Sequence, residues 1–127
     1  MPVGSRPVSS RGKVIGIGGT FFRARDTEAL KAWYTQHLGL PDAVFRSPAG
    51  TLVWGAFDEH TDYFGPSGQQ WMLNYRVDDL DLVLDRLRAA GVEIVDKRQE
   101  QEGVGRFGWA VDPEGNRFEL WEPAEGM

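Results

Sequence analysis

Glu119 is the residue of this sequence best placed to do chemistry. It stands between Phe118 and Leu120 in an expected strand, and alternation of side chains along a strand turns it away from the face on which these apolar neighbours pack. A carboxylate there is costly unless it is paired or protonated, and Arg76 is the most plausible cation to face it. Glu119 could therefore be an acid–base group or ligand anchor, or half of a structural pair with Arg76.

Other reactive residues are few. The chain has no cysteine, which excludes disulfides, thiolate nucleophiles and thiolate metal sites. No serine stands in a Gly-x-Ser-x-Gly turn, and there is no Walker-type phosphate loop. His37 lies on the apolar stripe of an expected helix, where we expect it to pack, and His60 lies in a polar loop, where we expect it to be solvated.

A first strand–helix unit precedes these residues. After a leader at residues 1–13, which we expect to be flexible, the pattern predicts a strand, a helix from Asp26 or Thr27 to Gly39, and two short strands. The strands are expected over residues 14–25, 43–46 and 51–57. The helix stripe is expected to be core: Leu30, Trp33, Tyr34 and Leu38.

A second unit repeats this plan after a turn-rich loop that ends at residue 70. Its helix runs from Asp78 or Asp79 to Gly91, with the same spacing as Asp26 to Gly39, which indicates an imperfect internal repeat. Its strands are expected over residues 71–77, 92–95, 106–111 and 117–122. The two halves are module one (about 14–58) and module two (about 71–122), joined by a linker (59–70) within one domain, 14–127.

Composition narrows the class of protein. A chain of 127 residues with a net charge of −5 and no basic stripe forms one domain and is a poor partner for nucleic acid. No apolar run is long enough to cross a membrane, and no signal peptide is evident. The absence of cysteine fits a cytoplasmic protein. Aromatic residues make up 12%, and large rings both fill cores and line pockets for small organic molecules.

Three stretches resemble one family in the right order. They are FFRARDTEALKAWYTQHLGL, MLNYRVDDLDLVLDRLRAAGVEIV and GRFGWAVDPEGNRFELWEP. Together they are similar to the vicinal oxygen chelate superfamily, which holds glyoxalase I, bleomycin resistance proteins and extradiol dioxygenases. The resemblance implies an α+β fold in which two βαβββ modules form an open, cup-shaped mixed sheet with helices on the outer face. It also implies a divalent metal held inside the cup by residues of the first and last strand of each module.

The metal positions that the resemblance implies lack donors here. Counting back from Asp26 and Asp78 places the first-strand positions at Gly19 and at Met72, or Trp71 if the count is off by one. The strand TLVWGAF carries no metal donor, which leaves Glu119 alone. One carboxylate cannot hold a transition metal firmly. We therefore expect no cofactor, and a divalent metal is disfavoured.

Strand alternation then assigns the cup lining. Polar groups among aromatic side chains in a concavity are typical of small-ligand sites. Besides Glu119 as the catalytic candidate, the expected ligand-binding residues are Phe21, Arg23, Trp54, Met72, Asn74, Arg76, Trp109 and Trp121.

Three functions remain open. The first is a glyoxalase-like protein with a degenerate metal site, which binds a small organic molecule or acts on it without metal as a lyase or isomerase. The second is a metal-dependent lyase or dioxygenase of the same superfamily. The third is a bacterial-type, antibiotic-sequestering resistance protein of the bleomycin resistance kind, without catalysis. Sheet edges need covering, so we expect a homodimer, and Tyr63 and Phe64 could mark its contact.

Overall fold

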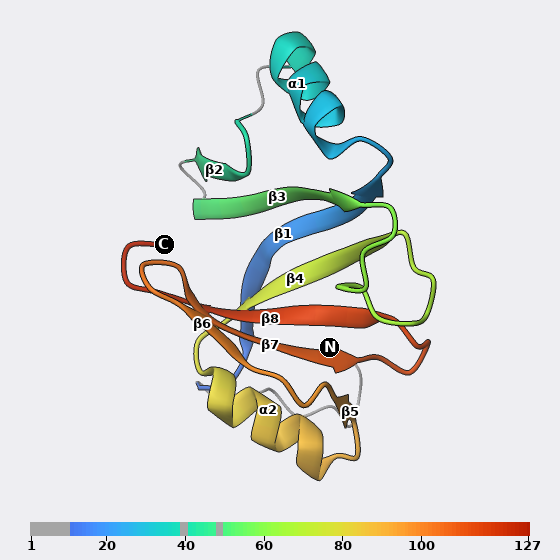
Figure 1. The fold of residues 1–127 in the computed structure, drawn as a ribbon. Helices are drawn as coiled ribbons and strands as arrows, with labels where there is room; N and C mark the ends of the chain where they lie inside the picture. The colour runs from blue at the N-terminus through green and yellow to red at the C-terminus, as the bar shows by residue number, and fades with distance from the viewer. Residues whose placement is uncertain (1–10, 39–40, 48–49) are drawn as a thin grey trace, which may run out of the picture.

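The fold is an eight-stranded mixed sheet with two helices, in a computed structural model that describes residues 11–38, 41–47 and 50–127 (Figure 1). Module one contributes β1 (Val14–Ala24), α1 (Thr27–Leu38), β2 (Val44–Ser47) and β3 (Gly50–Asp58). Module two contributes β4 (Trp71–Val77), α2 (Leu80–Ala89), β5 (Glu93–Ile94), β6 (Gln99–Gln101), β7 (Gly105–Val111) and β8 (Arg117–Pro123). The α+β fold class expected from the sequence is confirmed.

The two modules meet at the centre of the sheet. The strand order is β2-β3-β1-β4-β8-β7-β5, with β6 paired to β7. The first strands of the modules, β1 and β4, run antiparallel, while each lies parallel to the last strand of its own module, β3 or β8. This arrangement relates the modules by an approximate twofold axis between β1 and β4.

The modules differ in their strands. In the described part of module one, the strands are β1, β2 and β3, whereas module two has five. The additional short strand β6 was not predicted, because its sequence Gln-Glu-Gln is polar and exposed, without the apolar alternation that marks a strand. It pairs with the outer edge of β7.

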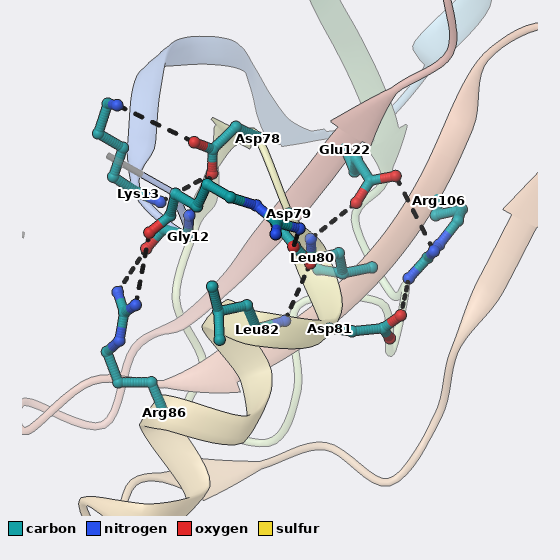
Figure 2. Close-up of polar contacts among 11 residues, drawn as sticks. Gly12, Lys13, Asp78, Asp79, Leu80, Asp81, Leu82, Arg86, Arg106 and Glu122 are labelled. Carbon is teal, nitrogen blue, oxygen red and sulfur yellow. Dashed lines mark hydrogen bonds and ion pairs between the residues drawn. The ribbon is translucent and has the colours of Figure 1, made fainter. Parts of the chain in front are cut away.

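The N-terminus of α2 is tied to the start of the described chain (Figure 2). Asp79 caps the helix by accepting a hydrogen bond from the Leu82 backbone, and Asp78 accepts from the backbone N–H groups of Gly12 and Lys13. Arg86 donates to the Gly12 carbonyl. The last residues of the expected leader, 11–13, are thus held against α2, and residues 1–10 lie outside the described chain.

Helix α2 is packed and α1 is only partly so. Val83 and Leu84 of α2 are buried in a core cluster with Leu120 of β8. On α1, Trp33 is 50% exposed, and His37, expected to pack, is also exposed. The expectation of a core stripe on α1 is therefore wrong for Trp33, because α1 lies beyond β3 at one end of the sheet (Figure 1). The side chain of Leu38 lies outside the described residues.

Candidate functional site

A single row of residues crosses the cup face of the sheet at its centre. Strand register places Val53 of β3 opposite Gly19 of β1, Gly19 opposite Asn74 of β4, and Asn74 opposite Glu119 of β8. Trp109 of β7 pairs with Glu119 and completes the row. Paired residues share a face of the sheet, so Glu119 lies at the centre of the cup, as alternation predicts.

The bounds of the elements support the expected equivalence between modules. β1 ends at Ala24 and β4 at Val77, and α1 begins at Thr27 and α2 at Leu80, so the counterpart of Gly19 is Met72. Asn74 pairs with Glu119 as its counterpart Phe21 pairs with Gly55, so the counterpart of Glu119 is Gly55, which has no side-chain donor.

Glu119 is almost fully buried, with 1% of its surface exposed. Asn74 donates a hydrogen bond from its side-chain amide to one carboxyl oxygen, and Tyr63 donates from its hydroxyl to the other. Burial raises the pKa of the Glu119 carboxyl, although the N–H and O–H groups of Tyr63, Asn74 and Trp109 act in the opposite direction. Burial thus favours a carboxyl group that keeps its proton above the usual pH range.

Tyr63 belongs to the loop between β3 and β4, which folds back over the sheet (Figure 1). Burial, reinforced by the nearby Glu119 carboxylate, raises the pKa of the Tyr63 hydroxyl far above its usual value. Tyr63 therefore remains a phenol that can donate a hydrogen bond. Sequence reasoning missed its role, and the available signal was an aromatic pair, Tyr63 and Phe64, inside an otherwise polar loop.

The loop is packed into the cup and closes much of it. Phe64 is fully buried in a core cluster with Phe21, Met72 and Trp109. Phe64 therefore contacts its own chain and is not available as a dimer contact. The linker was expected to be a polar loop, but its aromatic residues fill the cup. Burying the side chains of Tyr63 and Phe64 gains more free energy than the burial of the polar residues around them costs.

Arg23 holds this loop. Its guanidinium donates to the backbone carbonyls of Gln69, Glu59 and Thr61 and lies 5.0 Å from the centre of the Phe64 ring. Arg23 was expected to bind a ligand, and its Nε and Nη1 atoms are engaged by the carbonyls of the loop. Its place in the cup is correct, and these bonds hold the loop there.

Arg76 does not pair with Glu119. Its guanidinium donates to the backbone carbonyls of Thr51 and Met127 and lies 5.1 Å from the ring centre of Trp121. The expected Arg76–Glu119 pair is therefore wrong, since Arg76 pairs in register with Trp121, two residues beyond Glu119. Neutral donors, Tyr63 and Asn74, take the place of the expected cation.

The expected aromatic lining divides between the two faces. Phe21, Met72, Trp109 and Trp121 lie on the cup side and are buried, with 6% or less of their surface exposed. Trp54 lies on the helix side, where its ring is 5.0 Å from Phe22 and 5.2 Å from Tyr34 of α1. Trp54 is therefore wrong as a cup residue, because it pairs in register with Thr20, whose side of β1 faces the helices.

Gly18 makes room for Asn74. A Cβ atom at Gly18 would lie 2.0 Å from the Asn74 Oδ1 atom and 2.9 Å from the Trp121 ring. Asn74 is 1% exposed, and its Oδ1 atom accepts no hydrogen bond within the described residues. The missing side chain at Gly18 thus lets Asn74 turn its amide N–H toward Glu119.

A cavity of about 460 Å³ opens beside this network. Tyr63 and Trp109, which flank Glu119, both line it, together with Pro66, Lys97 and Arg117. We call it the cup-side cavity. Its volume lies in the range of pockets for small organic molecules.

A larger cavity lies on the other face of the sheet. It measures about 930 Å³ and is lined largely by apolar side chains, among them Leu73, Tyr75, Leu87 and Phe118. These side chains lie between α2 and the sheet, on the face opposite Glu119. The cavity beside Glu119 is the smaller of these two, so size alone does not select the candidate site.

The residues present do not fit the divalent metal of the superfamily. Of the four equivalent positions, Gly19, Met72 and Gly55 offer no nitrogen or oxygen donor from a side chain, and the Glu119 carboxyl accepts bonds from Tyr63 and Asn74. Among the described residues no three His, Asp or Glu side chains gather where they could hold a metal ion. A firm site needs more converging donors than Glu119 and Asn74 provide.

Two modules that are related by an approximate twofold axis and share one mixed sheet define the glyoxalase-like class of folds. The family model of the Glyoxalase/Bleomycin resistance protein/Dioxygenase superfamily matches residues 16–120, and the chain belongs to this superfamily. Among curated proteins none matches the chain. No helix in the described residues is long and apolar enough to span a membrane.

Solved structures share this fold. Methylmalonyl-CoA epimerase from Mycobacterium tuberculosis is 25% identical, with a TM-score of 0.63, and the match covers 93% of each chain. A variant of Streptomyces coelicolor methylmalonyl-CoA epimerase, in complex with 2-nitronate-propionyl-CoA, is 14% identical, with a TM-score of 0.67 over 88% of this chain and 99% of that one. A structure described as NAD-dependent benzaldehyde dehydrogenase from Legionella pneumophila is 15% identical, with a TM-score of 0.56 over 84% and 98%. These neighbours carry different activities, so activity has to be argued from the site.

Proposed function

We propose that this chain binds a small organic molecule in the cup-side cavity and moves a proton to or from it, without a metal ion. The observation that carries the proposal is the position of Tyr63. Its hydroxyl donates to the buried Glu119 carboxyl, and its side chain also lines the cavity. Tyr63 therefore stands between a proton-holding group and the space where a ligand can bind.

The proposed proton transfer balances along this path. When Glu119 is protonated, its O–H donates to the Tyr63 oxygen while the Tyr63 proton passes to a basic atom of the ligand. In the reverse direction the ligand gives a proton to Tyr63 as Glu119 takes the Tyr63 proton. Because the pKa of the carboxyl is raised by burial, Glu119 can hold and return a proton at a pH above its usual range.

This reaction class is that of an isomerase or lyase, and it agrees with the neighbours named as methylmalonyl-CoA epimerases. Binding without chemistry is the second candidate. It is favoured by the burial of Glu119, which no ligand can touch directly while Phe64 fills the cup. The two candidates share the same cavity and differ only in whether the proton moves.

Deuterium exchange separates the two candidates. The protein is incubated in D₂O with methylmalonyl-CoA or with mandelate, and loss of the α-proton is followed by NMR. We expect exchange with the parent chain and none with Glu119→Gln or Tyr63→Phe at equal folded concentration. Native mass spectrometry of the purified chain, which detects a retained molecule, is the parallel measurement. If neither probe exchanges its α-proton but the purified chain retains a molecule, the function is reduced to binding. If there is neither exchange nor a retained molecule, the proposal is overturned.

We also propose that the protein is a homodimer that pairs through the helix side of the sheet. Val14, Ile17 and Trp71 on this face are 50%, 48% and 57% exposed. Val14 and Trp71 also line the large cavity there. Several exposed apolar side chains on one face are typical of a surface that another protein covers.

A further inference from the structure

The cup-side cavity has an unbalanced set of charges. Among the residues that line it in the described chain, two are cations, Lys97 and Arg117, and one is a carboxylate, Asp62. The carboxylate is exposed to solvent, and no ion pair joins it to either cation within the described residues. The cavity therefore carries an excess of positive charge that the protein itself does not neutralise.

Arg117 has a donor that the described residues leave unused. Its terminal N–H donates to the Tyr63 carbonyl over 3.2 Å, which pins the loop, but its Nε atom is buried and makes no hydrogen bond. A buried cationic donor without an acceptor costs free energy, so the guanidinium as a whole gains from an anion placed beside it.

Lys97 lies on the other side of the same cavity. Its ammonium group is 5.5 Å from the centre of the Trp109 ring, which holds the charge over an aromatic face without neutralising it. Trp109 is 2% exposed, and its indole N–H is also buried without a hydrogen bond of standard geometry. Lys97 and Arg117 thus flank a wall made by Trp109, Tyr63 and Pro66.

We propose that the cup-side cavity takes a small organic anion, with its carboxylate or phosphate group between Lys97 and Arg117 and its apolar body against Trp109 and Pro66. This inference names the ligand class of the proposed function and rests on it for the location of the site. Carboxylate and phosphate share the chemistry that two such cations recognise. A volume of about 460 Å³ suits a body of roughly one ring or a short acyl group.

The Trp109 indole N–H signal in a ¹H–¹⁵N NMR spectrum, assigned with Trp109→Phe, reports on this cavity. The probes are benzoate, phenyl phosphate, benzamide and benzylamine, which present an anion, a dianion, a neutral amide and a cation on the same ring. We expect benzoate or phenyl phosphate to shift the signal in a saturable way, and benzamide and benzylamine to bind at least about tenfold more weakly. The stronger of the two anions identifies the group that the site prefers.

Lys97→Gln is the decisive variant, because Lys97 is exposed and makes no contact that holds the loop. Lys97→Gln should weaken the binding of the preferred anion by about tenfold. Lys31→Gln is the matched control, because it removes the same charge far from the cavity. Lys31 lies on α1, where it pairs with Glu28 and Asp42. Equal binding of benzamide or benzylamine, or an unchanged anion affinity in Lys97→Gln, overturns the inference. Proton transfer is measured separately by deuterium exchange, so a failure there leaves the anion result standing.

Discussion

Tyr63 and Glu119 are separated by 56 residues and joined by a hydrogen bond from the phenol to the buried carboxyl. This bond attaches the loop between β3 and β4 to the centre of β8. It engages the carboxyl at the position where the family resemblance implies a metal ligand, and it holds the loop against the cup face of the sheet. A substitution that breaks this bond is therefore expected to affect both the packing of the loop and the ionisation of the Glu119 carboxyl.

The stability of the protein should depend on the ionisation of Glu119. Its folded pKa is raised by burial, so as the pH rises through about 4.5, the ordinary value, the unfolded chain loses this proton while the folded chain keeps it. The folded state then binds more protons, and the free energy of unfolding falls with pH until the raised pKa is passed. Below the ordinary value the contribution is fully present.

Glu119→Gln removes this dependence because the amide does not titrate. Urea unfolding of both proteins from about pH 4, near the ordinary carboxyl pKa, upward to about pH 8 gives the difference of their free energies of unfolding at each pH. The parent should lose stability relative to Glu119→Gln as the pH rises. Asp78 and Asp81 have lowered pKa values and act with the opposite sign, but they are present in both proteins and cancel. A flat difference would show that Glu119 ionises normally.

Tyr63→Phe should loosen the loop without emptying the core. The variant keeps the ring and loses the hydroxyl, so we expect a loss of about 1–2 kcal/mol in unfolding free energy. The pKa of Glu119 should rise further, because the Tyr63 hydroxyl favours its charged form. Tyr34→Phe, on α1 and the other face of the sheet, is the control and should leave the carboxyl titration unchanged. The measurement is a ¹³C NMR titration of the Glu119 carboxyl.

Much of this arrangement follows from the sequence, because strand alternation fixes faces. Phe118 and Leu120 flank Glu119, which was enough to place it in the cup, and the same rule placed Met72 and Asn74 correctly. Trp54 was misplaced because the strand around it has apolar residues on both faces, so alternation gives no signal there.

The partners of Glu119 could not be predicted in the same way. Arg76 was the expected partner on charge alone, yet backbone carbonyls of Thr51 and Met127 take its donors. Tyr63 lies in a loop without periodicity, and contacts between residues so far apart in sequence are not encoded in any local pattern. The loop's place in the cup is set by burial of Phe64, a tertiary effect.

Gly18→Ala should destabilise the protein through Asn74. A Cβ atom there would lie 2.0 Å from the Asn74 Oδ1 atom, so the amide must move and its bond to Glu119 is lost. Overpacking of this kind costs about 1–3 kcal/mol in unfolding free energy. In an Asn74→Ala background the same change should cost less, because the clashing oxygen is gone. A double-mutant cycle measured by urea unfolding checks this, and additive effects would show that Asn74 is not the residue displaced.

The oligomeric state tests the helix-side surface. Ile17 pairs in register with Tyr75, whose ring packs beside the α2 core, so the exposed Ile17 side chain lies on the helix side of the sheet. We expect the parent to give twice the 14.2 kDa chain mass in light scattering at micromolar concentration. Ile17→Glu should shift it to the single-chain mass, because a charge in an apolar contact is costly to bury. Val44→Glu is the matched control: Val44 is 37% exposed but pairs with Val53, on the cup side, and should leave the dimer intact. A parent that scatters as a single chain at every concentration would show that the dimer does not form. A dimer that survives Ile17→Glu and dissociates with Val44→Glu would place the contact away from the helix side of the sheet.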